Sequence, residues 1–146
     1  MHTRKAHAVW EGNLQHGRGT ISLGNDKAQV PYNFAARFED GAGSNPEELI
    51  GGAHAGCFSM ALAHELSEAG HPPVQIETTA RVHLEKSADG FVIPKIELRT
   101  EAEVPGIDGE TFQRFAQGAK QNCPVSKVLS AAEITLTATL LSGQHA

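Results

Sequence analysis

The chain has 146 residues, of which 40% are hydrophobic, and it carries a formal net charge of -5 with a pI near 5.9. This length and apolar content predict one compact domain over residues 1–146, because two domains of ordinary size would not fit. The acidic balance leaves no basic stripe, which disfavours a nucleic-acid or anionic membrane partner. No apolar run has the length of a signal peptide or a membrane span, so we expect a cytoplasmic protein.

Three short strands are predicted in the first 40 residues, and turn residues separate them. The strands cover Lys5–Trp10, Arg18–Leu23 and Tyr32–Phe38. Glycine and asparagine occupy the gaps between them, which suits antiparallel connections. Arg37 alternates with apolar residues within the third predicted strand, so we expect its side chain to face either solvent or one specific partner.

The segment at 44–69, SNPEELIGGAHAGCFSMALAHELSEA, predicts a helix that other elements surround. Asn45 can cap its first turn, Pro46 suits the first helical position, and Gly70 with the following proline ends it. Its middle is apolar on nearly every face, and its glycines let another backbone come close. Cys57 would then lie mid-helix and largely buried. One small sheet cannot cover such a helix, so we expect a homodimer whose partner completes the burial.

The second half of the chain predicts two long strands, then two helices, then a last strand. These elements cover, in order, Val74–Lys86, Phe91–Glu103, Gly109–Lys120, Pro124–Ser130 and Glu133–Leu141. Pro94 has no N–H to give to a strand ladder, so it should mark an edge or a bulge. Strands and helices occur in blocks, and the predicted class is therefore α+β, with antiparallel sheets around the central buried helix.

The two cysteines carry the candidate chemistry, although they lie far apart in the sequence and form no CxxC motif. Cys123 precedes a helix that begins with proline, and the unpaired N–H groups of such a helix start favour a thiolate. Cys57 has no helix start beside it and needs a cation. Arg37, held by Glu47 in a forked ion pair, is the preferred cation, and Arg18 is the rival. A Cys57 thiolate would attack a peroxide to give a sulfenic acid, which Cys123 would convert to a disulfide.

Other interpretations of these residues remain open. Both cysteines would be inert core residues if the protein were a non-catalytic module that binds a hydrophobic small molecule. His54 lies one helical turn before Cys57 and would allow a Cys/His transferase, but no oxyanion hole or third group can be identified. The eight histidines show no metal-ligand spacing, so neither a metal nor another cofactor is predicted.

Four segments together resemble the osmotically inducible protein C (OsmC) family, relatives of the organic hydroperoxide resistance proteins. These segments are PYNFAARFED, SNPEELIGGAHAGCFSMAL, VPGIDGETF and NCPVSKVL. The resemblance implies an intertwined α+β homodimer that acts as a thiol peroxidase at the subunit interface. It matches Cys57 to the peroxidatic cysteine, Cys123 to the resolving cysteine and Glu47 to the carboxylate that pairs with an arginine. The OsmC branch gives Arg37 as that arginine, whereas the hydroperoxide resistance branch takes it from near Arg18.

The resemblance also implies substrates and partners. Organic hydroperoxides, including those of fatty acids, would be better substrates than hydrogen peroxide, in a role of oxidative and osmotic stress defence. An apolar pocket would desolvate the alkyl tail. Its candidate residues are Leu49, Ile50, Phe58, Met60 and Val125. The implied reductant is a dithiol, carried by a lipoylated protein.

Overall fold

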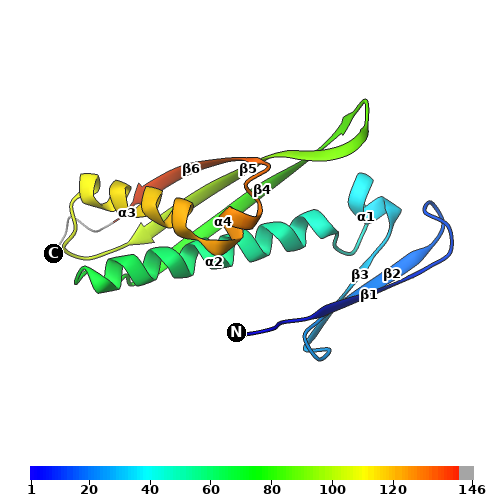
Figure 1. The fold of residues 1–146 in the computed structure, drawn as a ribbon, viewed down its shortest axis with the longest axis horizontal. Helices are drawn as coiled ribbons and strands as arrows, with labels where there is room; N and C mark the ends of the chain where they lie inside the picture. The colour runs from blue at the N-terminus through cyan, green and yellow to red at the C-terminus, as the bar shows by residue number, and fades with distance from the viewer. Residues whose placement is uncertain (142–146) are drawn as a thin grey trace. The chain divides into compact units, whose positions relative to one another are not determined.

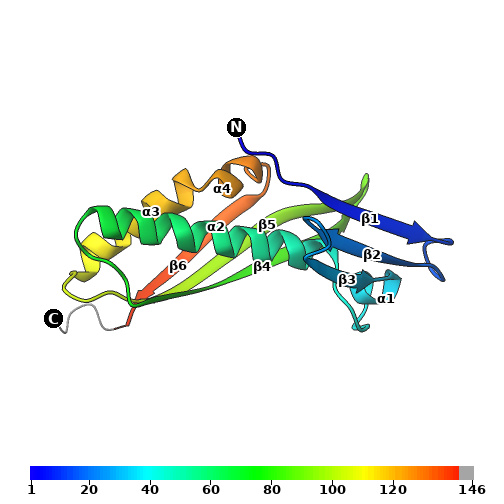
Figure 2. The same ribbon diagram turned by 90° about the horizontal axis from the view of Figure 1, so that it is seen from below.

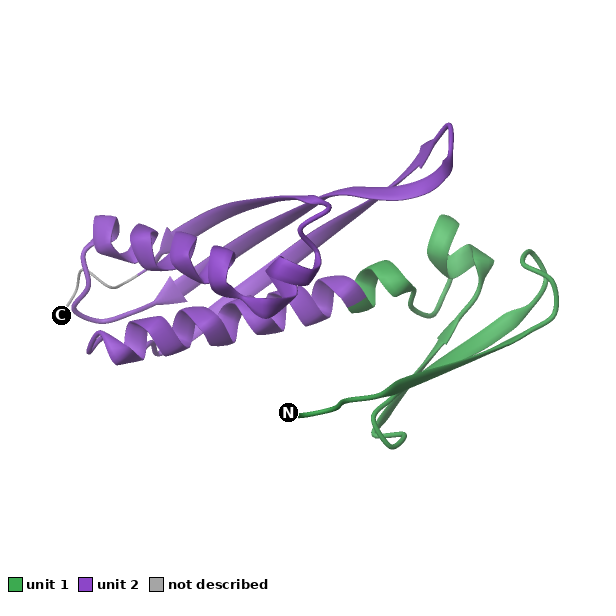
Figure 3. Cartoon of the chain, in the orientation of Figure 1, with its two compact units in different colours: residues 1–49 green, residues 50–146 purple. Residues whose placement is uncertain are grey.

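The computed structural model describes residues 1–141, and residues 142–146 of the predicted single domain lie outside the described residues. The chain divides into two compact units, residues 1–49 and residues 50–146 (Figure 3). Each unit contains a three-stranded sheet of its own. The single-domain expectation stays a prediction.

The first unit holds an antiparallel meander of three strands (Figure 1). The strands are β1 (Ala6–Glu11), β2 (Arg18–Leu23) and β3 (Ala28–Tyr32). Residues of β2 pair in register with both neighbours. The first two predicted strands are therefore confirmed.

The third predicted strand, Tyr32–Phe38, is wrong, because a short helix occupies most of it. Helix α1 covers Phe34–Phe38, and the strand β3 ends before it. The side chain of Asn33 accepts a hydrogen bond of 2.8 Å from the N–H of Ala36, which caps the helix start. The apolar and aromatic residues of this stretch matched a strand pattern, but the cap favours the helical turn that follows it. Arg37 therefore lies on a helix and not on a strand.

Helix α2 covers Pro46–Glu68, as the sequence predicts. Asn45 caps it by accepting a hydrogen bond of 2.8 Å from the N–H of Glu48. At its other end Gly70 has a φ of 85°, a left-handed conformation that glycine adopts without steric penalty, and the N–H of His71 bonds back to the carbonyl of Leu66. The fully buried side chains of α2 recur every four residues, which places them on one face. They are His54, Phe58, Leu62 and Leu66.

The sheet of the second unit contains β4 (Gln75–Ser87), β5 (Gly90–Glu103) and β6 (Glu133–Leu140), in that order. Strands β4 and β5 form the predicted hairpin, and the register shifts between His83 and Glu85, opposite the predicted irregularity at Pro94. Strands β5 and β6 pair in parallel, because the helical connection between them returns the chain to the same end of the sheet.

Helices α2, α3 (Gly109–Asn122) and α4 (Pro124–Val128) lie on the sheet of the second unit (Figures 1 and 2). One hydrophobic core joins α2 and α3 to one face of that sheet. Its fully buried members include Phe58 from α2, Ala102 from β5 and Phe112 from α3. The predicted α+β class is confirmed, and the named strands within residues 1–141 form three antiparallel pairs and one parallel pair.

Two general properties of residues 1–141 bear on function. None of their helices is both long and apolar enough to cross a membrane. The same residues contain no group of three or more His, Cys, Asp or Glu side chains placed to hold a metal ion.

Candidate active site

The fold of the second unit brings the two cysteines close together. Cys57 lies in the middle of α2, and Cys123 lies at the junction of α3 and α4. The backbone of Cys123 serves both helices, because its N–H donates to the carbonyl of Ala119 (2.9 Å) and its carbonyl accepts from the N–H of Lys127 (3.1 Å). The two thiols lie close enough that each shifts the pKa of the other. The junction of α3 and α4 therefore lies beside the middle of α2.

The surroundings of the two sulfurs shift their pKa values in opposite directions. Burial raises the pKa of the Cys57 thiol, the hydrogen bond with Cys123 raises it further, and the N–H of Val125 opposes this rise only in part. Burial also acts to raise the pKa of Cys123, but hydrogen bonds from the Cys57 thiol, from the N–H and hydroxyl of Ser126 and from the N–H of Val125 outweigh it and lower the pKa. The surroundings of Cys123 thus favour its thiolate, whereas those of Cys57 within this chain favour the neutral thiol.

The cysteine with the raised pKa is also the more accessible of the two. Cys57 is partly exposed, whereas Cys123 is fully buried. A molecule from solvent therefore meets Cys57 first. No cation is among the groups that shift the pKa of Cys57 within the described residues, so the expected cation beside Cys57 stays a prediction.

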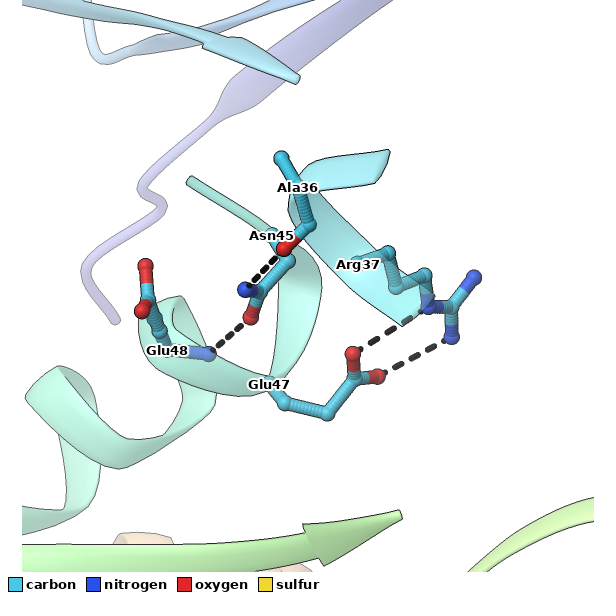
Figure 4. A network of polar contacts seen from close by, with 5 residues as sticks. All are labelled: Ala36, Arg37, Asn45, Glu47 and Glu48. Carbon is cyan, nitrogen blue, oxygen red and sulfur yellow. Dashed lines mark hydrogen bonds and ion pairs between the residues drawn. The ribbon is translucent and has the colours of Figure 1, made fainter. Parts of the chain in front are cut away.

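Arg37 and Glu47 form a forked ion pair within the first unit (Figure 4). Nε of Arg37 donates to Oε1 of Glu47 at 3.1 Å, and Nη2 donates to Oε2 at 2.9 Å. The carboxylate lies in the first turn of α2, where the unpaired N–H groups favour a negative charge. Nη1 of Arg37 has no hydrogen-bond partner within residues 1–141, and 36% of the arginine side chain is exposed. The fork thus fixes the guanidinium plane and leaves one donor edge for another group.

Asn45 places the two halves of this ion pair relative to each other (Figure 4). Its Oδ1 caps α2, while its Nδ2 donates to the carbonyl of Ala36 at 2.9 Å, next to Arg37 on α1. One side chain therefore joins the end of α1 to the start of α2. Arg18, the rival arginine, lies exposed at the start of β2 and forms no ion pair within the described residues.

Two further polar side chains lie near the cysteine pair: His54, which the sequence offered as the base of a Cys/His transferase, and Ser126, to which it gave no role. His54 is fully buried, and its Nε2 lies 2.7 Å from Oγ of Ser126. Ser126 is in turn among the groups that lower the pKa of Cys123. Each of the two residues lies one helical turn from a cysteine, His54 before Cys57 and Ser126 after Cys123. That spacing was the available signal, but it becomes informative only when the two helices are known to meet.

The residues predicted to line a substrate pocket have different environments. Phe58 is fully buried and belongs to the core of the second unit, so it does not face an open site in the described chain. Met60 is 76% exposed and Val125 is partly buried. Of these three residues, only Met60 and Val125 present surface to a ligand.

Comparison with known proteins decides the family. The sequence model of the family described as OsmC-like protein matches residues 39–139. This chain belongs to the OsmC-like family. Peroxiredoxin OsmC of Escherichia coli strain K12 is 54% identical to it over 140 residues, which cover 95% of this chain and 97% of that protein. An organic hydroperoxide resistance protein-like protein of Mycoplasma pneumoniae is 32% identical over 87% of this chain and 84% of its own.

A solved structure shares the OsmC-like fold with this chain. The crystal structure of an organic hydroperoxide resistance protein from Elizabethkingia anophelis superposes with a TM-score of 0.71 at 24% identity, over 99% of this chain and 98% of that one. The family resemblance and the fold class that the sequence predicted are therefore confirmed.

Proposed function

We propose that this OsmC-like protein reduces organic hydroperoxides to alcohols, with Cys57 as the peroxidatic cysteine and Cys123 as the resolving cysteine. The broader class, a peroxide-detoxifying redox enzyme, is confirmed by the 54% identity with Peroxiredoxin OsmC over nearly the whole chain. The observation that carries the finer proposal is the proximity of an accessible and a buried thiol. Inert core cysteines would not need one sulfur open to solvent and a second thiol behind it.

The proposed reaction has two steps at sulfur. The Cys57 thiolate attacks the outer oxygen of the hydroperoxide, the O–O bond breaks, and the departing alkoxide takes a proton to become the alcohol. Sulfur loses two electrons and becomes a sulfenic acid. The Cys123 thiolate then attacks the Cys57 sulfur, hydroxide leaves and is protonated to water, and a disulfide forms. A dithiol donor, for which we propose a lipoylated protein, returns both cysteines to thiols.

Arg37 and Glu47 are the proposed electrostatic partners of this reaction. A guanidinium near Cys57 would favour its thiolate and the alkoxide that develops on the leaving oxygen. Arg37 and Glu47 belong to the first unit, whereas Cys57 belongs to the second. We propose that the arginine at Cys57 comes from a second chain, as the intertwined homodimer that the family resemblance implies would allow.

Exposure along α2 supports a homodimer. Gly52, Gly56 and Met60 are exposed, and their spacing of four residues places them on one face. A Cβ atom added at either glycine would meet nothing within 4 Å. An apolar face on the longest helix of the chain fits a site that a second α2 covers. The same partner would bring its Arg37 and complete the site.

The preference for organic hydroperoxides rests on apolar surface near the accessible sulfur. Met60 follows Cys57 by three residues on α2, and the backbone of Val125 is among the groups that shift the pKa of Cys57. Contacts of this kind would favour an alkyl tail by about 25 cal/mol for each square ångström removed from water. The name of the Mycoplasma pneumoniae relative also refers to organic hydroperoxides. We propose the cytoplasm as the compartment, because its reducing thiol systems suit a dithiol that must be regenerated.

The test compares cumene hydroperoxide with hydrogen peroxide as substrate, using a lipoyl dithiol as reductant and mass spectrometry to follow both cysteines. We expect faster consumption of the organic peroxide and a Cys57–Cys123 disulfide in the oxidised protein. Cys57→Ser should abolish turnover, and Cys123→Ser should allow at most one cycle before the sulfenic acid accumulates. Full activity of Cys57→Ser would overturn the assignment. Absence of both turnover and thiol oxidation would favour the alternative of a hydrophobic-ligand module.

A further inference from the structure

The sheet of the second unit has a face that its helices do not cover. Side chains alternate between the two faces of a strand, and the hydrophobic core takes its members from even-numbered positions of β4, β5 and β6. The odd-numbered positions of the paired stretches therefore lie on the opposite face, away from α2 and the cysteines. Six of these side chains surround a cavity of about 240 Å³. They are Thr79, Arg81, Glu97, Arg99, Thr135 and Thr137.

The strand register arranges the six residues in two adjacent rows that run across the sheet. Written from β4 through β5 to β6, one row is Thr79, Arg99, Thr137 and the next is Arg81, Glu97, Thr135. Arg81 and Arg99 are therefore diagonal neighbours on antiparallel strands, with Cα atoms about 7–8 Å apart. Long side chains span such a distance, so both guanidinium groups can reach one ligand in the cavity they line.

The charges of the two arginines are not matched by an ion pair. Within residues 1–141 neither Arg81 nor Arg99 forms an ion pair or a side-chain hydrogen bond, and both are exposed. Glu97 lies opposite Arg81, but its Oε1 accepts a hydrogen bond of 2.6 Å from Nε2 of His83 instead. That bond lowers the pKa of Glu97, and Lys95 and Arg81 lower it further. Two like charges that line one cavity repel each other, and an anion between them would relieve the repulsion.

We propose that this cavity binds a phosphate group, which Arg81 and Arg99 hold from two sides. Guanidinium groups donate paired hydrogen bonds to phosphate oxygens, and a tetrahedral phosphate has enough oxygens to accept from both arginines and from a threonine hydroxyl. A carboxylate has two oxygens in one plane and satisfies one such fork. The next row of the face holds Glu77 and Glu101, which line a separate cavity with Glu103. Acidic side chains beside the site favour a small anion over an extended polyanion.

Titration of the full-length protein with inorganic phosphate at constant ionic strength tests this site by two-dimensional amide NMR. We expect saturable shifts at the amides of the six lining residues. Arg81→Gln and Arg99→Gln should each raise the dissociation constant about tenfold, the loss expected for hydrogen bonds to a charged group. Arg99→Lys keeps the charge but loses the fork, so it should still weaken binding. Glu97→Gln removes a repelling charge and should strengthen binding by up to about fivefold.

Arg114→Gln is the matched control, because Arg114 is an exposed arginine on α3, outside this face of the sheet. It removes the same charge and should leave the dissociation constant unchanged. Equal weakening in Arg114→Gln and Arg99→Gln would show a nonspecific attraction and overturn the site, and so would the absence of saturable shifts. Acetate that binds as tightly as phosphate would overturn the choice of a phosphate group.

Phenyl phosphate distinguishes the source of the group. Tighter binding than that of inorganic phosphate would assign the site to a phosphate ester, and weaker binding would assign it to the free ion. The site does not depend on the proposed peroxidase reaction. Arg99→Gln should leave turnover of cumene hydroperoxide unchanged, because the cavity and α2 lie on opposite faces of the sheet. Failure of the peroxidase assay would therefore not affect the phosphate site, and loss of phosphate binding would not affect the peroxidase proposal.

Discussion

Substitution of alanine for Gly52 or Gly56 tests the proposed dimer. The substitution should raise the stability of the protein if this helix face is free, and it should weaken association if a partner covers the face. In the described chain a Cβ atom at either position meets nothing within 4 Å. Nothing then subtracts from the gain in helix propensity, which is about 1 kcal/mol for each glycine replaced. A monomeric protein would therefore become more stable, by about 2 kcal/mol for the double variant if the two effects add.

A covered face gives the opposite result for association. A methyl group forced into a close-packed contact costs about 1–3 kcal/mol, and two-fold symmetry repeats each contact. Each variant should thus weaken the dimer by at least about 2 kcal/mol, or about 30-fold in its dissociation constant. We expect this result for Gly56→Ala, since Gly56 lies on α2 next to Cys57.

Sedimentation equilibrium gives the dissociation constant, and urea unfolding at several protein concentrations gives the stability of monomer and dimer separately. Gln117→Leu is the control, because it adds bulk at an exposed position of α3 outside the proposed interface. A rise of about 1 kcal/mol in unfolding free energy with an unchanged dissociation constant would refute the dimer face on α2.

Three further predictions concern the core, the ion pair and a helix cap. Phe58→Ala removes a fully buried ring and should lower the free energy of unfolding in urea by about 3–5 kcal/mol, and a loss below about 1 kcal/mol would contradict its place in the core. Arg37→Lys keeps the charge but loses the fork to Glu47, so kcat/KM should fall about 10- to 100-fold, and an undiminished value would show that the fork is not needed. The N–H and hydroxyl of Thr111 lower the pKa of Asp108, so the stabilisation from this cap is complete above its ordinary pKa and disappears as the pH falls through the lower folded-state value. Asp108→Asn should flatten that part of the acid-unfolding curve, and an unaltered curve would exclude Asp108 as its source.

The sequence predicts those elements whose signals are local. Asn45 with Pro46 marks the start of α2, Asp108 marks the start of α3, and Pro124 marks the start of α4, because a side-chain cap or a proline in the first turn acts locally. The prediction around Asn33 was wrong for a related reason. The side chain of Asn33 accepts a hydrogen bond from the N–H of Ala36, and this helix cap competes with the strand pattern of the same residues. The sequence pattern alone does not reveal which of the two prevails.

The remaining features depend on packing between distant segments. Parallel pairing of β5 with β6 follows from how α3 and α4 return across the sheet, and no residue of either strand signals it. The bond between His54 and Ser126 joins residues 72 positions apart, so neither neighbourhood indicates the other. The fork between Arg37 and Glu47 spans ten positions, and the chemistry of a guanidinium beside a carboxylate was sufficient to predict it.

The placement of Cys123 between two helices makes the two sides of the site unequal in rigidity. Cys57 is anchored in a helix of 23 residues whose buried face belongs to the core, whereas the helix after Cys123 has five residues. If a disulfide joins them, the short helix is the element that yields, since few backbone bonds must open to release it. Oxidation would therefore be recorded as faster amide hydrogen exchange in residues 124–128, while the middle of α2 keeps its protection. During the catalytic cycle the α2 side of the site would then stay rigid, while the short helix at residues 124–128 would open and close.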